Sequence, residues 1–164
     1  MLNKINFLFV TLFGIGKIKS IPGSFASLAT TIFLFFILNI LNISPSIILF
    51  SIIIIFFISL YAVNIFIKDL DNKDPKEVVI DEFIGQSIPI CLYEVSHEGP
   101  KENDQVLISY FIMFILFRIF DIVKPYPVSY YDKNFKNSFG VIMDDVCAGL
   151  YVVVVLVLYM IIST

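Results

Sequence analysis

Two pairs of adjacent carboxylates stand out from an otherwise apolar sequence. Asp81 and Glu82 begin one apolar segment, and Asp144 and Asp145 immediately precede another. Carboxylates that crowd together repel one another, so such a group needs a cation. A ligand set made only of oxygen atoms, with no Cys or His nearby, favours a hard ion: Mg²⁺, with Mn²⁺ or Ca²⁺ as alternatives.

Cations near the end of a third apolar segment add a means of binding phosphate. Arg118 and Asp121 are three residues apart and therefore share one face of a helix, and Lys124 follows at the next break. Arg binds a phosphate as a fork and Lys as a point charge. A hard metal ion beside such cations indicates phosphoryl chemistry, in which a remaining carboxylate can act as general base.

The composition requires that membrane helices position these residues. Of the 164 residues, 59% are hydrophobic and 15% are charged, and the mean hydropathy is +0.93. A soluble domain carries about 25% charged residues. The length predicts a single integral membrane domain over residues 1–164. A net charge of −3 with a single Arg excludes a basic surface for nucleic acid.

The apolar segments predict an all-α, polytopic helical bundle of about five spans. A helix needs about 20 apolar residues to cross a bilayer. The predicted spans are residues 25–43, 47–67, 105–120 and 146–162, with 80–93 as a short third span or a re-entrant segment.

Positive charge predicts the orientation, because short cytoplasmic loops are enriched in Lys and Arg. With five spans and a cytoplasmic N-terminus, ten of the eleven basic residues lie inside and only Lys101 lies outside. Four spans would divide them seven to four and would split the acidic residues across the bilayer. Five spans bring both acid pairs and the Arg118–Asp121 pair to one membrane face. The N-terminal segment lacks a signal-peptide cleavage site and is expected to be retained.

Other features are assigned structural roles. Gly85 lies one turn after Asp81, and Gly149 one turn after Asp145, so both predict close helix packing beside the acids. Cys91 and Cys147 fall in apolar stretches without metal-binding spacing and are predicted to be small buried hydrophobic residues.

Other phosphatase chemistries are not supported. Neither Cys has the Arg shortly after it that a Cys nucleophile requires. The only histidine, His97, lies in the opposite loop. The Asp-Leu-Asp run at 69–71 is assigned to a solvated loop over residues 68–77, because no soluble α/β domain is present to hold an aspartyl nucleophile.

Five stretches, in one order along nearly the whole chain, form a further pattern. They are Gly14-Ile-Gly16 with Ile21-Pro-Gly-Ser-Phe-Ala-Ser27; Asp81-Glu-Phe-Ile-Gly85; Phe117-Arg-Ile-Phe-Asp121-Ile-Val-Lys-Pro-Tyr-Pro127; Tyr131-Asp132; and Gly140-Val-Ile-Met-Asp-Asp-Val-Cys-Ala-Gly149. This pattern resembles the phosphatidylglycerophosphatase A family, and its third and last stretches are long and specific.

The resemblance implies Mg²⁺-dependent hydrolysis of phosphatidylglycerophosphate to phosphatidylglycerol and phosphate. It implies a phospholipid substrate and a location in a bacterial inner membrane, with the active site on the cytoplasmic face. No obligate protein partner is inferred. Carried over by position, the resemblance makes catalytic candidates, as metal ligand or base, of Asp81, Glu82, Asp121, Asp144 and Asp145. Within this set the metal ligands are expected to be Glu82, Asp121, Asp144 and Asp145.

The same resemblance implies phosphate contacts from Arg118, Lys124, Ser24 and Ser27. The family pattern leads us to expect Thr and Gly where this sequence has Ser24 and Ala26. An ordinary helix N-cap is an equally good interpretation of Ser24.

Two other functions are open. A phospholipid-head-group transferase also uses Mg²⁺ and several Asp at a membrane face, but it normally shows an Asp-Gly-x-x-Ala-Arg run, which this sequence lacks. A non-catalytic membrane subunit would place its acids along a pathway through the membrane, whereas these gather at one end.

Overall fold

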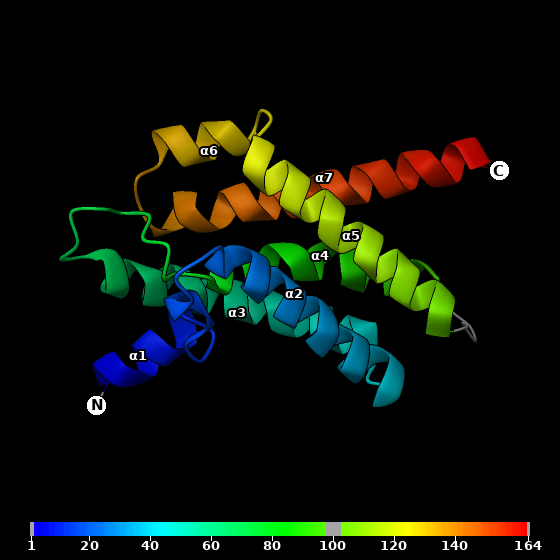
Figure 1. Cartoon of the computed structure of the whole chain (residues 1–164), viewed down its shortest axis with the longest axis horizontal. Coiled ribbons are helices and arrows are strands. Elements are labelled where there is room, and N and C mark those ends of the chain that lie inside the picture. The colour runs from blue at the N-terminus through cyan, green and yellow to red at the C-terminus, as the bar shows by residue number, and fades with distance from the viewer. Residues whose placement is uncertain (1, 98–102, 164) are drawn as a thin grey trace.

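A computed structural model describes residues 2–97 and 103–163, and these ranges form helices and connecting loops without any strand (Figure 1). The elements are α1 (Leu2–Val10), η1 (Ile15–Lys17), α2 (Pro22–Phe35), η2 (Phe36–Ile40), α3 (Pro45–Ile67), α4 (Ile80–Ser96), α5 (Asn103–Val123), α6 (Val128–Asn134) and α7 (Ser138–Ser163). The predicted all-α class is confirmed.

Four helices have the length and composition needed to cross a membrane. They are α2 with its π-helical continuation η2 (Pro22–Ile40), α3, α5 and most of α7 (Ser138–Ile162). The fifth predicted span corresponds to α4, whose 17 residues include Pro89 and two acids in the first turn. At this length α4 is shorter than the four candidate spans. The structure therefore has four candidate spans and one shorter helix where the sequence predicted about five spans.

Prolines explain where the first two spans begin. Pro22 and Pro45 each occupy the first turn of a helix, where the missing N–H of proline has no intrahelical partner to lose. The first span therefore begins at Pro22 and ends at Ile40, whereas the sequence predicted residues 25–43.

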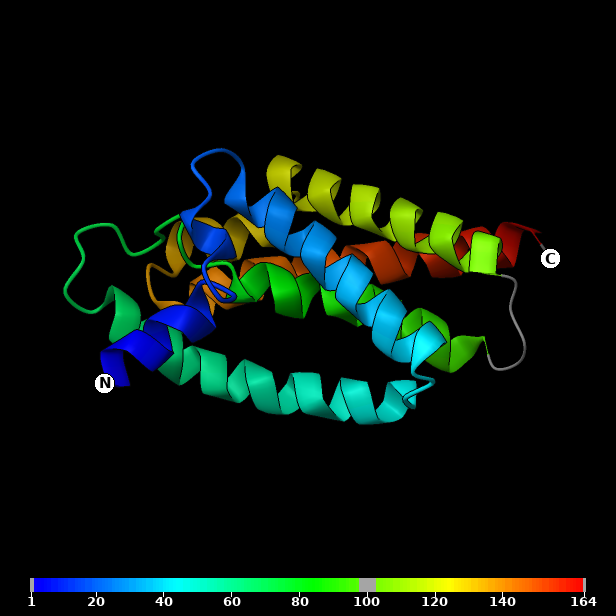
Figure 2. The ribbon, with the colours of Figure 1, turned by 60° about the horizontal axis from the view of Figure 1, so that its bottom comes forward.

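The helices share one polar end, at which α2, α4 and α7 begin and α3 and α5 end (Figure 2). We call it the acidic end, because both acid pairs lie there. The short α6 connects α5 to α7 at this end, and α1 lies beside it, while the C-terminus lies at the opposite, far end (Figures 1 and 2). This arrangement brings distant parts of the chain to one place.

The central element is α4, which contacts α2, α3, α5 and α7. Its closest approach is to α7: a Cβ atom at Gly149 would collide with the carbonyl oxygen of Gly85, and one at Gly85 would lie 2.6 Å from the carbonyl oxygen of Asp145. The predicted role of these two glycines in close packing is confirmed. It places the first turn of α4 directly beside the first turns of α7.

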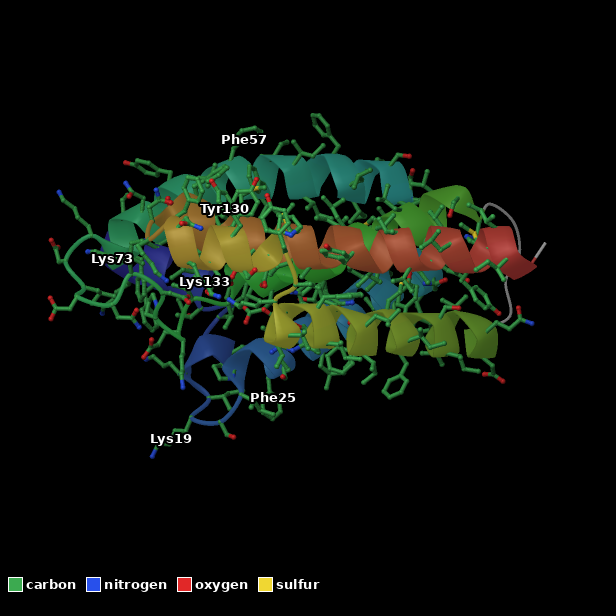
Figure 3. All side chains as sticks on the ribbon, turned by 90° about the horizontal axis from the view of Figure 1, so that it is seen from above. Lys19, Phe25, Phe57, Lys73, Tyr130 and Lys133 are labelled. Atoms are coloured by element: carbon green, nitrogen blue, oxygen red, sulfur yellow. The ribbon has the colours of Figure 1, made fainter. Side chains whose placement is uncertain are left out.

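The outer surface is apolar along the spans and charged at the acidic end. Side chains such as Phe57 and Ile122 are largely exposed, as expected for residues that face lipid. Lys19, Lys73 and Lys133 gather toward the acidic end, whereas Phe57 projects from the side of the bundle (Figure 3). The 68–77 loop joins α3 to α4 without a helix, as predicted.

Candidate active site

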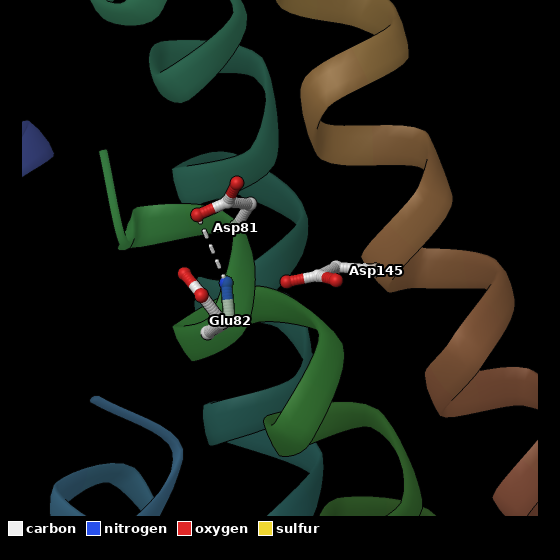
Figure 4. A group of neighbouring side chains, drawn as sticks. All are labelled: Asp81, Glu82 and Asp145. Atoms are coloured by element: carbon white, nitrogen blue, oxygen red, sulfur yellow. Dashed lines mark hydrogen bonds between the residues drawn. The ribbon is translucent and has the colours of Figure 1, made fainter. Parts of the chain in front are cut away.

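Three carboxylates meet at the acidic end of the bundle. Asp81 and Glu82 come from the first turn of α4 and Asp145 from the second turn of α7, and a carboxylate oxygen from each lies within 4.8 Å of those from the other two (Figure 4). Asp81 and Asp145 are buried, and the Glu82 side chain is only 14% exposed. We call these three residues the acid cluster. Several negative charges withdrawn from water in so small a space require a positive partner.

Backbone amides fix the orientation of the acid pairs. The Glu82 N–H donates a hydrogen bond to Asp81 Oδ1 at 3.1 Å (Figure 4), and the Asp145 N–H donates to Asp144 Oδ1 at 3.0 Å. In each pair the first residue therefore has one oxygen bound locally and the second oxygen available for another partner. Carboxylates are also favoured in the first turn of a helix because of its dipole, which suits the position of Asp81 and Glu82.

Arg118 links α5 to the acid cluster and to α2. Its Nη1 lies 2.8 Å from Asp121 Oδ2 and 4.0 Å from Glu82 Oε1, and it donates a hydrogen bond to Ser27 Oγ at 3.4 Å. The Arg118 Nε atom is buried and has no hydrogen-bond partner among the described residues. The guanidinium is therefore anchored on one side and retains an unused donor.

The start of α2 closes the site from another direction. A Cβ at Gly23 would collide with Glu82 Oε1 and would lie 3.3 Å from Arg118 Nη1, so a larger residue there would displace the Glu82 carboxylate. Ser27 donates to the Gly23 carbonyl at 2.9 Å. Ser24 lies in the first turn of α2, and the N-cap position belongs to Ile21. The N-cap interpretation of Ser24 is wrong, because the helix begins at Pro22.

Lys124 forms a second group beside the acid cluster. Its Nζ lies 2.7 Å from Asp132 Oδ1 and 2.8 Å from Asp144 Oδ2. Burial lowers the pKa of the ammonium, but the two carboxylates raise it by more, so the pKa of Lys124 lies above its ordinary value. This lysine is charged at neutral pH, and its charge is balanced by protein carboxylates.

The charged residues predicted for the site therefore form one cluster and two ion pairs. Asp81, Glu82 and Asp145 come together; Arg118 pairs with Asp121, and Lys124 with Asp144. Sequence reasoning did not select Asp132, although the Tyr131-Asp132 dipeptide belongs to the pattern of five stretches. It also missed Gln86, which is fully buried, has an amide without a hydrogen-bond partner among the described residues, and lies one turn after Glu82.

The acid cluster fits a hard divalent cation. Its donors are all carboxylate oxygens, which are the ligands that such ions prefer. Glu82 Oε2 is buried and has no hydrogen-bond partner within the described part of the chain, so this carboxylate keeps capacity for a partner outside the folded chain.

The chain is similar to known proteins along most of its length. The family model described as phosphatidylglycerophosphatase A matches residues 8–160. A phosphatidylglycerophosphatase A of Haemophilus influenzae is 35% identical over 155 residues, which cover 94% of this chain and 88% of the relative. One of Escherichia coli is 30% identical over 140 residues, covering 84% and 73%.

A third relative shares a shorter region. A Bacteroides thetaiotaomicron protein, provisionally named a phosphatidylinositol-3-phosphatase, is 44% identical over 80 residues, which cover 49% of this chain and 45% of the relative. No solved structure matches the chain. The family match includes the acid cluster, Arg118 and Lys124 and extends over nearly all of the sequence. The chain belongs to the phosphatidylglycerophosphatase A family.

Proposed function

We propose that this protein hydrolyses phosphatidylglycerophosphate to phosphatidylglycerol and inorganic phosphate, using a Mg²⁺ ion held by the acid cluster. The reaction is that of its family, in phospholipid synthesis. The observation that carries the residue assignment is the meeting of Asp81, Glu82 and Asp145 within 4.8 Å of one another, beside the Arg118 guanidinium. A cation site next to a phosphate-binding arginine is what phosphomonoester hydrolysis requires.

The acid cluster would hold the ion, and other acids would orient the cations. When bound, Mg²⁺ neutralises phosphate oxygens and makes water more acidic. Asp121 and Asp144 were predicted as ligands, but their nearest charged partners are Arg118 and Lys124. We therefore assign them the role of holding those two side chains in position.

Arg118 and the start of α2 would bind the phosphate of the substrate. Arg118 has a donor in reserve at Nε, and Ser27 already contacts its Nη1. Ser24 lies in the first turn of α2, where the helix dipole favours an anion, and Ser27 lies about one turn further along. Lys124 forms ion pairs with two carboxylates, Asp132 and Asp144. Its positive charge would therefore act on the site from outside the acid cluster.

The acidic end would face the cytoplasm of a bacterial cell and lie at its inner membrane. Ten Lys and Arg residues belong to the helix ends and connections of the acidic end, and short cytoplasmic loops are enriched in these residues. Lys101, the one basic residue expected on the other side, lies outside the described residues. A cysteine introduced at exposed Lys76 would then react with membrane-impermeant maleimide only after the inner membrane is opened.

The test is phosphate release by the purified protein in mild detergent. We expect release from phosphatidylglycerophosphate with Mg²⁺, loss of release in EDTA, and recovery when Mg²⁺ is restored. Phosphatidylinositol-3-phosphate is the second substrate to test, because of the Bacteroides relative, and phosphatidic acid is the third. Absence of release from all three by folded, Mg²⁺-loaded protein would contradict the proposal, and equal rates in EDTA would contradict the role of the metal.

A further inference from the structure

Gln86 is a fully buried polar side chain one helical turn from the acid cluster. It is 0% exposed, and neither its Oε1 nor its Nε2 atom has a hydrogen-bond partner among the described residues. A buried amide without partners lowers the stability of a protein. Such a group in the middle of a packed helix therefore indicates a partner that is not part of the folded chain.

The position of Gln86 on α4 relates it to the acid cluster. Gln86 follows Glu82 by four residues, so the two side chains lie on one face of the helix, about 5–6 Å apart at their Cβ atoms. That face at Glu82 meets Gly23 of α2 and Arg118 of α5. Gln86 therefore lies one turn deeper in the bundle than the proposed phosphate site.

The buried hydroxyls of α2, a helix that packs against α4, do not supply the missing partners. The hydroxyls of Ser27, Thr30 and Thr31 each donate to a carbonyl of their own helix, at 2.8–2.9 Å. All three are buried. The polar side chains that α2 contributes to the core therefore already bond within their own helix, and none of them is a partner of Gln86.

The open hydrogen-bonding atoms around the acid cluster match the needs of a hydrolysis. Two of them are acceptors, Glu82 Oε2 and Gln86 Oε1, and two are donors, Gln86 Nε2 and Arg118 Nε. A water that attacks phosphorus is oriented when two acceptors hold its protons, which directs its lone pair toward the phosphate. The oxygens of the phosphate, in turn, accept from donors.

We propose that Gln86 is a catalytic residue that, together with Glu82, holds the attacking water; this inference rests on the proposed function. The water oxygen forms the new bond to phosphorus, and the bond from phosphorus to the glycerol oxygen breaks, leaving its electron pair on that oxygen. One proton of the water passes to solvent, and the glycerol oxygen takes a proton from solvent. The sum is one water consumed, with phosphatidylglycerol and phosphate formed.

The test compares Gln86→Met with wild type and with Ser59→Ala. Methionine keeps the length of the side chain and removes both polar amide atoms. Ser59 on α3 is the matched control, because its hydroxyl is also buried and without a hydrogen-bond partner among the described residues but does not belong to the site. The measurements are kcat, KM and the inhibition constant of inorganic phosphate with Mg²⁺, and Tm in metal-free detergent.

For Gln86→Met we expect kcat to fall by about 10²-fold, with KM and phosphate inhibition within about threefold of wild type. Its Tm should equal or exceed that of wild type, because the substitution removes a buried group without a partner. Ser59→Ala should keep the wild-type kcat and should not lower Tm.

Three results would overturn the inference. They are a kcat for Gln86→Met within twofold of wild type, a rise in KM at unchanged kcat, which would indicate phosphate binding, and a loss of Tm that accompanies the loss of rate, which would indicate a structural amide. A wild-type protein that is inactive on every lipid phosphate would instead refute the proposed function itself.

Discussion

The two ends of α4 differ in whether the polar groups around them have hydrogen-bond partners. At the far end, Tyr110 donates a hydrogen bond to Glu94 Oε1 at 2.9 Å and accepts one from Asn39 at 3.2 Å. At the acidic end, Glu82 Oε2 and both polar atoms of Gln86 have no hydrogen-bond partner within the described ranges. One helix therefore carries a satisfied network at one end and an open one at the other.

The difference separates groups that stabilise the bundle from groups available for chemistry. The surface between α4, α5 and α7 at the far end is mostly apolar, and Pro89, Leu116, Val153 and Leu156 contribute to it. A hydrogen bond that is complete within the protein contributes to folding and has little capacity left for a ligand. Groups that will bind a cation, a phosphate or a water must keep that capacity, at a cost to the stability of the protein alone.

The largest effect is expected from Asp145→Asn. Loss of one carboxylate of the acid cluster should reduce kcat/KM by about 10²–10⁴-fold. In metal-free detergent Tm should be unchanged or higher, because one of three crowded negative charges has been removed. Phosphate release and thermal unfolding on the same samples measure both quantities.

Asp104→Asn is the matched control for this variant, because Asp104 is an exposed acid in the first turn of α5. It should retain wild-type activity. A stable Asp145→Asn protein with full turnover would show that the acid cluster is structural.

The next effect is expected from Gly149→Ala. The added methyl group would collide with the Gly85 carbonyl, which should destabilise the protein by about 1–3 kcal/mol and move Asp145 away from α4. Stability in detergent and activity should therefore decline together, whereas Asp145→Asn should lose activity without losing stability. Leu150→Ala is the control, because it shortens an exposed side chain at the adjacent position. It should change stability and activity much less than Gly149→Ala does.

A smaller effect is expected from Lys124→Met, which leaves Asp144 buried without its cation. We expect a loss of about 1–2 kcal/mol, less than for a fully buried ion pair because the Lys124 side chain is 27% exposed. Since the pKa of Lys124 is raised in the folded state, its contribution is complete below the ordinary lysine pKa of about 10.4 and is lost only as pH rises through the folded value.

The stability difference between wild type and Lys124→Met should therefore be constant from about pH 7 to 9 and shrink at higher pH. Urea titrations at several pH values measure it. A difference that already disappears below about pH 9 would contradict the assigned ion pairs.

The smallest effect on activity is expected at the far end, from Tyr110→Phe. Loss of the hydroxyl removes its bonds with Glu94 and Asn39 and should cost about 1–2 kcal/mol of stability, with kcat unchanged. The comparison of the two ends predicts this split between stability and activity. A loss of turnover in folded Tyr110→Phe protein would show that the far end takes part in the reaction.

The sequence predicted the fold well where the signal was periodic or repeated along the chain. Apolar length predicted the long helices, and the glycines one turn after the acids predicted the contact of α4 with α7. The start of α2 was placed too late because the apolar run begins at Phe25, whereas the helix begins with Pro22.

Pairings within the site were less accessible to sequence reasoning. Lys124 contacts Asp132 and Asp144, and no spacing rule relates residues that far apart across the α5–α6 turn and the start of α7. Lys124 could therefore be recognised as a cation of the site, but not as one already neutralised. Gln86 could be placed on the same face as Glu82 from its spacing, yet its lack of partners depends on every helix around it.

The close crossing of Gly85 and Gly149 has a consequence for biosynthesis. Asp81 and Glu82 leave the ribosome long before Asp145, and α4 is short, contains a proline and begins with two acids, so it is poorly suited to remain in lipid alone. Only when α7 has been translated and inserted does α4 gain the partner whose glycine it fits. A chain interrupted before α7 would lack Asp145 and would therefore be unable to form the complete cation site, so activity would report that synthesis and insertion of α7 had finished.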